Sequence, residues 1–456
     1  MTIACDAAQR GLTVALVDAA DFGSGTTFNH LRTIHGGLRY LQTLDLARAR
    51  ESVRERRALA HIAPWAVRPL PFVLPLSRSI TRGPMAMRAA FALDSLVASD
   101  RNESLDSSLR LPAGRVVSRD EAVALCPDLT GRPIAGAAVW YDYVAWDADR
   151  LTFAWALSAA QHGAALANYL EATALIVDRG RVVGARGIDR VDGVDLTIAA
   201  RAVVNATGAH LNRLLTPLAA SVGLPLLQAM NVVTRRAAPA TALGGRSATG
   251  RNLFLVPWKG RALFGTWESG ELCEPARVGI NASAVTAFLA ELNEAFPTQL
   301  LTRDDIALVH RGVVPARVRS EQTPSLEGHD CVFEHHGDGL AGLISVAGTK
   351  YTTARAVAER IVDRVLELLH RAAPPSTSAS RLLPHVALDG DALLRHAAQH
   401  EMVMTLADAV MRRTPLGALG CPDTETLTRA SRIVGDALHW SPARQSQEVA
   451  AVHALY

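Results

Sequence analysis

The stretch IACDAAQRGLTVALVD, residues 3–18, decides the fold of this chain. Its Ala-rich first half, residues 3–9, predicts a short helix that ends at Arg10-Gly11. Residues 12–17 then form a largely apolar run, which is typical of a strand buried on both faces of a parallel sheet. Asp18 follows this run directly. A helix, a glycine, a buried strand and an acid, in this order, form the second half of a βαβ unit that binds a dinucleotide.

Asp18 is the candidate for a contact with the adenosine ribose of such a dinucleotide. In dinucleotide-binding units this acid lies about 20 residues after the Gly-x-Gly-x-x-Gly turn that holds the phosphates. Asp18 has that spacing if the last glycine of the turn directly precedes Met1. The first strand and the turn would then lie before the first residue of the sequence. We therefore expect Asp18 to bind the ribose rather than only to close a turn.

The length and composition of the chain exclude several classes of protein. Its 456 residues allow two or three domains, because single hydrophobic cores rarely grow beyond about 300 residues. An apolar fraction of 49% excludes a disordered chain. A net charge of +3 argues against a nucleic-acid partner, which would require a basic stripe. The five cysteines are scattered and show no CxxC spacing, so we expect neither a metal site nor a disulfide framework.

We expect the protein to be cytoplasmic. Scattered cysteines fit a reducing compartment, and no run reaches the roughly 18 apolar residues that a membrane-spanning helix needs. The N-terminal segment contains Asp6, Arg10 and Asp18, unlike a signal peptide. The apolar segment 78–96 carries flanking arginines and is either a helix on a membrane surface or a partly buried helix. The protein is thus expected free in the cytoplasm or peripheral on the cytoplasmic membrane.

Further patterns divide the rest of the chain. Short apolar runs, separated by Asp178-Arg179-Gly180 and Val191-Asp192-Gly193, predict antiparallel strands over residues 165–205. Residues 373–384 are rich in Pro, Ser and Thr and predict a linker. Residues 385–456 have a mostly helical pattern. We therefore predict a small helical domain after the linker.

Six motifs follow one another over nearly the whole chain in the order and spacing of a known family. They are DAAQRG with its strand and Asp18 (6–18), IHGGLRY (34–40), VNATG (204–208), VPW (256–258) with Gly265-Thr266, SVAGTKYTT (345–353), and the segment from Glu401-Met402 to Arg412-Arg413-Thr414. Together they resemble the FAD-dependent glycerol-3-phosphate dehydrogenase family, within the D-amino-acid-oxidase-like flavoproteins. The resemblance implies an α/β fold with an FAD-binding Rossmann-type domain of the glutathione-reductase kind. It also implies a substrate domain built on an antiparallel sheet, and a C-terminal helical domain.

The resemblance further implies where these domains lie. The FAD-binding and substrate domains are expected to interleave within residues 1–372, ahead of the linker at 373–384 and the helical domain at 385–456. The expected FAD-binding parts are 1–60, 145–215 and 340–372, and the expected substrate parts are 61–144 and 216–339.

FAD is the cofactor that the resemblance implies. Thr26, Thr27 and Arg32 match loop positions along the pyrophosphate and the flavin. Gly208 matches a turn at which the backbone approaches the ring, since glycine has no side chain. The helix after Gly348 would offer free N–H groups to the flavin. The residues expected to bind FAD are Asp18, Thr26, Thr27, Arg32, Thr33, Ala172, Thr207, Gly208, Gly348, Lys350, Tyr351 and Thr352.

Basic residues in two motifs imply a small anionic, phosphorylated substrate. Arg39 and Lys350 match residues with which the family holds a phosphate and polarises a hydroxyl group. The chain has only two lysines, Lys259 and Lys350, which favours a task at 350 that arginine cannot perform. His35 is either a proton acceptor or a satisfied core histidine. The expected catalytic residues are His35, Arg39, His310 and Lys350, and the expected substrate-binding residues are Arg39, Tyr40, Arg317, Lys350 and Thr352.

One departure from the family pattern concerns the substrate directly. Its Gly-Val-Arg-Pro segment is here Gly312-Val313-Val314-Pro315, so Val314 replaces a substrate-binding arginine. Arg311 and Arg317 flank this segment, but on a regular strand their side chains face the side opposite to residue 314. Neither arginine would then replace the missing one unless Pro315 breaks the alternation.

Three other positions also depart from the family pattern. The Lys-Gly-x-His segment of the family is here Gln228-Ala229-Met230-Asn231, and its Ser-Ser pair is His30-Leu31. His310 occupies a usually aromatic position and is a candidate for a new contact or base. These changes weaken glycerol 3-phosphate as the specific substrate and leave the flavin fold intact.

We predict an FAD-dependent dehydrogenase that oxidises the secondary alcohol of a small anionic substrate, in the first place sn-glycerol 3-phosphate to dihydroxyacetone phosphate, by hydride transfer to the flavin. The resemblance implies quinone or oxygen as the electron acceptor, and the sequence leaves a homodimer open. Two alternatives remain. One is an enzyme of the same fold that acts on another 2-hydroxy acid or an amine. The other is a non-catalytic remnant that lacks the phosphate-binding turn and would bind FAD poorly.

Overall fold

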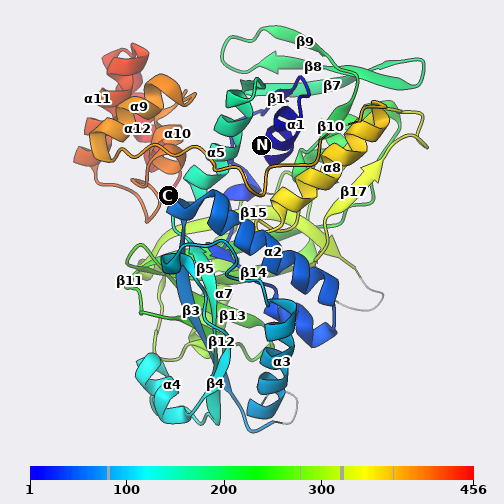
Figure 1. The fold of residues 1–456 in the computed structure, drawn as a ribbon. Coiled ribbons are helices and arrows are strands. Elements are labelled where there is room, and N and C mark those ends of the chain that lie inside the picture. The colour runs from blue at the N-terminus through cyan, green and yellow to red at the C-terminus, as the bar shows by residue number, and fades with distance from the viewer. Residues whose placement is uncertain (80–82, 278, 319–322, 373) are drawn as a thin grey trace.

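The structure, a computed structural model, describes residues 1–79, 83–277, 279–318, 323–372 and 374–456. Short parallel strands and the helices around them occupy one half of the molecule, and a long antiparallel sheet occupies the other (Figure 1). The last helices lie beside the half with the parallel strands. The mixed α/β fold with a helical C-terminal part, expected from the sequence, is therefore confirmed.

Two groups of strands carry the dinucleotide-binding half. In the first, β1 (Ala15–Val17) pairs in parallel with β6 (Ala165–Ala167). In the second, β10 (Val203–Asn205) pairs in parallel with β18 (Leu343–Ala347), and β17 (Cys331–Glu334) adds an antiparallel edge. Helices α1 (Thr2–Gln9), α5 (Ala148–Gln161) and α8 (Ala354–Leu368) pack around them.

The strand expected over residues 12–17 is shorter than predicted. Only Ala15–Val17 pairs with a neighbour. Leu12 and Val14 instead pack with Ala7 of α1 and with Val362 of α8. The apolar residues are thus used for packing between helices before the strand begins.

The antiparallel meander expected between residues 165 and 205 is present. Strands β7 (Leu170–Asp178), β8 (Arg181–Asp189) and β9 (Asp195–Ala199) form a three-stranded sheet. The two residues between β7 and β8, Arg179 and Gly180, both have positive φ, +47° and +76°. This geometry is typical of the two-residue turns that join twisted hairpin strands. The first segment of the region, β6, belongs to the parallel pair instead.

The long sheet contains ten strands among the described residues, in the order β16-β15-β11-β14-β13-β12-β3-β5-β2, with β4 beside β5. Its pairs are antiparallel, apart from the parallel pair β12–β3. One face packs on α7 (Ala282–Ala295) through buried Phe264, Phe288 and Phe296. The strands are β2 (Thr33–Ile34), β3 (Val67–Leu76), β4 (Arg115–Val117), β5 (Gly136–Ala145), β11 (Leu226–Ala237), β12 (Ala242–Arg246), β13 (Asn252–Trp258), β14 (Arg261–Leu272), β15 (Ile306–Arg317) and β16 (Ser325–Leu326).

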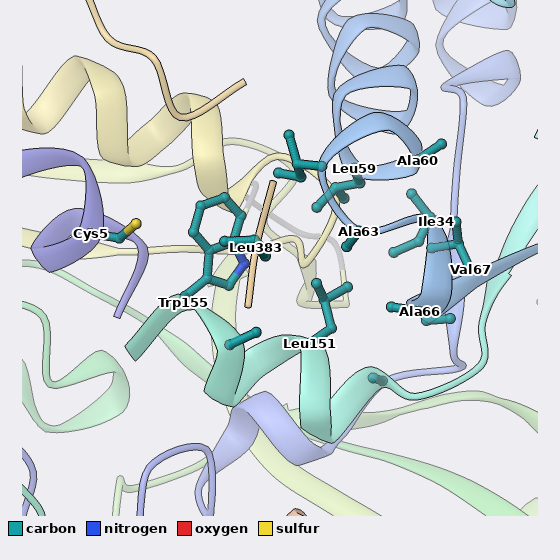
Figure 2. Close-up of a cluster of buried hydrophobic side chains, with 14 of the residues drawn as sticks. Cys5, Ile34, Leu59, Ala60, Ala63, Ala66, Val67, Leu151, Trp155 and Leu383 are labelled. Carbon is teal, nitrogen blue, oxygen red and sulfur yellow. The ribbon is translucent and has the colours of Figure 1, made fainter. Parts of the chain in front are cut away.

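A central hydrophobic core joins the two halves of the molecule (Figure 2). Ile34 of β2 and Leu59 of α2 (Leu46–Ile62) lie in it with Leu151 and Trp155 of α5. Cys5 of α1 and Leu383 also belong to it, although they are far apart in the sequence. Fully burying one large apolar side chain stabilises a fold by about 1.5–3 kcal/mol. The core therefore fixes β2, whose neighbouring loops carry several of the predicted site residues.

The C-terminal helices are tied to this body by buried charges. Asp21 lies after β1 and accepts hydrogen bonds from Arg413, at 2.9 and 2.6 Å, and from Arg412. Burial opposes ionisation of Asp21, but the charges of Arg413 and Arg412 outweigh it and lower the pKa of the carboxyl group. Glu401 pairs in the same way with Arg150 of α5. The helices are α9 (Gly390–His400), α10 (Leu406–Asp408) with the π-helical turn Ala409–Arg413, α11 (Thr424–Leu438) and α12 (Pro442–His453).

The predicted linker is bound to the body of the protein along much of its length; its residue 373 lies outside the described residues. Ser376 donates a hydrogen bond to Asp6 of α1. Ser378 is 1% exposed and accepts a hydrogen bond from Arg355 of α8 at 3.1 Å. Leu383 enters the central core. The serines of the predicted linker bond to buried polar groups, so the segment packs on α1 and α8.

Within the described ranges, no helix is long and apolar enough to cross a membrane. The segment 78–96 falls largely on α3 (Pro84–Val97), and its residues 80–82 lie outside the described part. Met87 and Phe91 of α3 are buried against β3 and β5. Met85 and Leu96 are 71% and 75% exposed. The remaining described helices are α4 (Arg119–Leu125) and α6 (Leu211–Leu215), together with short single turns.

Candidate functional site

The candidate site lies where β10 and β18 end at the same edge of their sheet. Thr207-Gly208 follows β10, and Gly348 follows β18. A Cβ atom added to Gly208 or to Gly348 would meet no atom within 4 Å, and Gly208 has a φ of +61°. Ligands of open α/β sheets bind at the carboxyl ends of the strands. Two glycines with free space above them, at this edge, fit the close backbone approach that a flat ring such as flavin needs.

Unpaired polar atoms next to this edge also fit a polar cofactor. Arg32 is fully buried, pairs with Asp149 at 3.2 Å, and lies 4.8 Å from the Trp258 ring; its Nε has no partner in the described part of the chain. His310 is also fully buried, and its Nδ1 is likewise unpaired there. Burial and the charge of Arg32 lower the pKa of His310 well below its usual value. Buried polar atoms without partners cost free energy unless a ligand or water satisfies them.

Asp18 stands at the carboxyl end of β1, as predicted. Its Oδ1 accepts a hydrogen bond from the Ala20 backbone at 3.1 Å. Burial is the main cause that raises the pKa of Asp18. A carboxylate at a strand end can accept hydrogen bonds from a ribose. Its ribose contact stays a prediction.

The loop before β2 holds several predicted FAD contacts. Thr26 lies in a 3-10 turn (Thr26–Phe28), where its Oγ1 donates to the Val313 carbonyl at 2.9 Å and accepts from the Val313 N–H at 3.2 Å. This pair of bonds fastens the loop to β15. Thr27 is exposed, and Thr33 of β2 donates to the Leu31 carbonyl at 3.1 Å. Ala172 lies on β7, opposite Gly187.

His35 is held by Asp142 of β5, a residue that the sequence analysis did not identify. The His35 Nδ1 lies 3.2 Å from Asp142 Oδ2. A carboxylate only accepts hydrogen bonds, so Nδ1 carries the proton and Nε2 of the neutral ring is left as an acceptor. The His35 side chain is 50% exposed, whereas that of Asp142 is 3% exposed. His35 is therefore an accessible ring on a buried support, rather than a core histidine.

Both carboxylate oxygens of Asp142 accept hydrogen bonds from more than one donor. Oδ1 accepts from the Gly36 N–H at 2.7 Å and from Arg56 of α2 at 2.5 Å, and Oδ2 also accepts from Trp140 Nε1 at 3.2 Å. Burial opposes ionisation, but the hydrogen bond from His35 and the charge of Arg56 lower the pKa of Asp142. Its contribution to stability is therefore present above the ordinary carboxyl pKa and is lost as the pH falls through the lowered value.

The two glycines after His35 are required by packing. A Cβ atom on Gly36 would lie 2.1 Å from the Arg56 guanidinium. Gly37 has a φ of +82°, and a Cβ atom there would lie 2.8 Å from Ser52 of α2. The Gly-Gly pair thus lets the loop approach α2 and reach Asp142.

The loop between β18 and α8 contacts the same region. Thr352 Oγ1 accepts a hydrogen bond from the His35 backbone N–H at 3.3 Å. Tyr351 donates to the Ala148 carbonyl at 3.0 Å and stacks on His30 with ring centroids 4.7 Å apart. The structure therefore brings the two predicted motifs, IHGGLRY and GTKYTT, into contact.

Arg39 and Lys350 meet at one side chain, Tyr40. The Lys350 Nζ lies 4.2 Å from the centre of the Tyr40 ring, and Arg39 donates to the Tyr40 hydroxyl at 3.3 Å. Burial opposes the shift, but the hydrogen bond from Lys350 and the charge of Arg39 lower the pKa of Tyr40. Burial lowers the pKa of Lys350, and nearby Arg48 and Arg39 lower it further. Lys259 instead pairs with Asp147 at 2.5 Å.

The side chains of β15 alternate between two faces around Val314, as the sequence predicted. The pairing of β15 with β11 is unbroken from Pro315–Leu226 to Leu308–Val233. Residues 310, 312 and 314 therefore share one face, which meets Arg32 through His310 and Thr26 through Gly312. Arg311 lies on the opposite face and is exposed. Pro315 does not disturb this alternation.

Arg317 has an acidic partner of its own. It pairs with Glu327 at 2.8 Å and lies 3.3 Å from His329 Nδ1. Its predicted contact with the substrate stays a prediction, as do the roles assigned to His35, Arg39, Tyr40, His310, Lys350 and Thr352.

We expect the open space at Gly348 to be needed for FAD. In a Gly348→Val variant, a branched side chain enters the space above the end of β18, so the ratio of bound FAD to protein should fall at least about fivefold. Gly337→Val is the matched control, because Gly337 also has open space at its Cβ position but lies in a surface turn. Flavin absorbance of the purified variants measures the ratio. Equal FAD content in both variants would contradict the assignment.

Two family models match the chain. One, described as FAD dependent oxidoreductase, covers residues 1–364, and the other, the C-terminal domain of alpha-glycerophosphate oxidase, covers residues 333–445. Among curated proteins, the glycerol-3-phosphate dehydrogenase of Synechocystis sp. is 31% identical over 423 residues, which span 87% of this chain and 75% of that protein. The glycerol-3-phosphate dehydrogenase of Mycobacterium leprae is 31% identical over 386 residues, which span 83% of this chain but only 63% of that protein.

Solved structures show the same fold. The glycerol-3-phosphate dehydrogenase of Bacillus halodurans, complexed with FAD, has a TM-score of 0.74 and 22% identity, and covers 100% of this chain and 91% of its own. The L-alpha-glycerophosphate oxidase of Mycoplasma pneumoniae, with FAD bound, has a TM-score of 0.57 and 14% identity over 84% of this chain and 96% of its own.

Proposed function

The chain belongs to the FAD-dependent oxidoreductase family, and we propose that it oxidises sn-glycerol 3-phosphate to dihydroxyacetone phosphate. One observation carries this proposal. An accessible histidine on a buried carboxylate, His35 on Asp142, is joined through one loop to the cationic group Arg39 and Lys350. A proton acceptor next to an anion site is what oxidation of a phosphorylated alcohol requires. The names of the relatives support glycerol 3-phosphate as that alcohol.

FAD would be held by Asp18, Arg32, Gly208 and the loop after Gly348. When it is bound, FAD supplies the acceptor for a hydride. Arg39 and Lys350 bind the phosphate and so orient the carbon that is oxidised. His35 Nε2 accepts the proton of the secondary hydroxyl group as the C–H bond breaks with its electron pair. Asp142 holds Nδ1–H and stabilises the positive charge that the ring gains.

Anaerobic addition of glycerol 3-phosphate to the FAD-loaded protein should bleach the flavin bands. An Arg39→Ala variant should raise the KM by about tenfold or more, because one charged hydrogen-bond donor to the phosphate is lost, while FAD content stays unchanged. Absorbance spectra measure the FAD content, and the bleaching of the flavin bands over a range of substrate concentrations gives the KM. Loss of flavin in the variant would argue against a substrate role for Arg39. Flavin bands that persist in the wild type would point to another hydroxy acid or an amine.

Asp142→Asn should lower kcat by about a hundredfold or more, because an amide can donate to Nδ1 and place the wrong nitrogen towards the substrate. The KM should change less than about threefold, since the phosphate contacts remain. Stopped-flow reduction of the flavin over a range of substrate concentrations separates the two constants. A lower Tm is expected in either case, because the ion pair with Arg56 is also weakened. A rise in the KM as large as the fall in kcat would indicate a structural role only.

Electrons would pass from the reduced flavin to quinone or oxygen. We also propose that the protein binds the surface of the cytoplasmic membrane. Met85 and Leu96 are both exposed on α3 and are eleven residues, or about three turns, apart, so they share one face. With Arg88 on the exposed side, this face fits a lipid interface. Sedimentation with anionic phospholipid vesicles should resist salt in the wild type and be lost in Met85→Ser/Leu96→Ser. Binding unaffected by the double substitution would remove α3 from the interface.

A further inference from the structure

Three cations converge on the ring of Tyr40. The distances from the ring centre are 4.2 Å to Lys350 Nζ, 4.9 Å to Arg48 Cζ and 5.3 Å to Arg39 Cζ. Arg39 lies in the 3-10 helix Leu38–Thr43, Arg48 in the first turn of α2, and Lys350 in the loop before α8. An aromatic face attracts a cation, but three cations at one ring repel one another. Such a grouping is stable only if negative charge is supplied to it.

The acids nearby supply only part of that charge. Asp45 lies 3.4 Å from Arg48 Nε, and it also caps α2 by accepting the Arg48 N–H at 3.1 Å. Glu268 is close enough to Arg39 for its pKa to be affected, although burial, the larger cause, raises the pKa of this carboxyl group. The three cations are thus left with an excess of positive charge. Burial is the main cause that lowers the pKa of Lys350; Tyr40 opposes this shift, and the charges of Arg48 and Arg39 add to it.

Arg48 also has an unused hydrogen-bond donor. Its side chain is 12% exposed, and its Nη2 is buried without a partner among the described residues. Nη1 faces Gly328, where an added Cβ atom would lie at 2.8 Å. The guanidinium is therefore held between the Tyr40 ring and a glycine, and a donor remains unpaired. A buried arginine with a free donor is suited to an anion that accepts several hydrogen bonds.

We infer that Arg48 is a third anion-binding residue of the substrate site, which acts with Arg39 and Lys350 on the phosphate group. A phosphate carries up to two negative charges, and its oxygens can accept hydrogen bonds from a guanidinium and from an ammonium at the same time. The identity of the anion as glycerol 3-phosphate rests on the proposed function. The existence of the three-cation site does not.

The test uses the FAD-loaded protein and the variant Arg48→Ala, with Arg54→Ala as the matched control. Arg54 lies on the same helix and is exposed, so its removal changes the charge of α2 equally. Arg48→Ala should raise the KM for glycerol 3-phosphate in anaerobic flavin reduction by about tenfold or more, with kcat within about twofold. Arg54→Ala should change both by less than about twofold. A merely structural Arg48 would lower the Tm and leave the KM unchanged, which would overturn the inference.

Binding of inorganic phosphate, followed by isothermal titration calorimetry, separates this inference from the proposed function. Suppose that glycerol 3-phosphate does not reduce the flavin, but that Arg48→Ala binds phosphate with a higher Kd than the wild type. The anion site would then be retained, and glycerol 3-phosphate would be rejected as the substrate. An unchanged Kd for phosphate together with an unchanged KM would reject Arg48.

A second variant keeps the arginine and displaces it. In Gly328→Ala, the new methyl group meets the flexible end of Arg48, which must move. Phosphate binding and the KM should weaken in the same direction as in Arg48→Ala, by about threefold or more. Gly337→Ala is the control, since nothing lies near its Cβ position. An unaltered Kd in Gly328→Ala, with the fold intact, would contradict the inference even if Arg48→Ala does not fold.

Discussion

The ionised carboxylate of Asp142 is the interaction on which the arrangement of the site depends. It stands on β5, binds the backbone after His35, the ring of His35 itself, and the guanidinium of Arg56 on α2. This carboxylate therefore connects β5, the loop after β2 and helix α2. Removing one partner of a buried ion pair typically costs about 3–5 kcal/mol, because the other charge is left without compensation. The orientation of the His35 ring and the ion pair with α2 therefore depend on one side chain.

The site has two regions of different electrostatic character. Around Arg32 and His310, charge is buried, the histidine is neutral, and polar atoms are left for a ligand to satisfy. Around Tyr40, the cations are closer to the surface and exceed the acids beside them. The first region suits a cofactor that stays bound, since its polar contacts lie away from water. The second suits a small anion that enters and leaves, and His35, in the motif that carries Arg39 and Tyr40, donates its backbone N–H to Thr352 of the other motif.

Local sequence patterns predicted the parts of the fold that depend on neighbouring residues. The strand before Asp18, the hairpin at Arg179-Gly180 and the glycines near the cofactor edge follow from local rules, and the motif order indicated the family. Asp142 was missed because its partner His35 lies 107 positions away and is brought near only by the pairing of β2 with β5. A lone acid within an apolar strand was the available signal. Composition indicated a linker after residue 373, but composition does not reveal that Ser378 bonds to a buried arginine.

The unbroken register between β11 and β15 limits how this site can change. Side chains on β15 alternate, so one residue inserted directly after Leu308 would exchange the two faces beyond it, moving Arg311 inwards and His310 outwards. Such an insertion would also remove His310 from Arg32, whereas direct replacement at an inward position such as Val314 would introduce a positive charge and leave the rest of the strand in place. A helix offers more freedom, because residues three and four apart share a face. New charge specificity can therefore arise on α2 while the strand keeps its length.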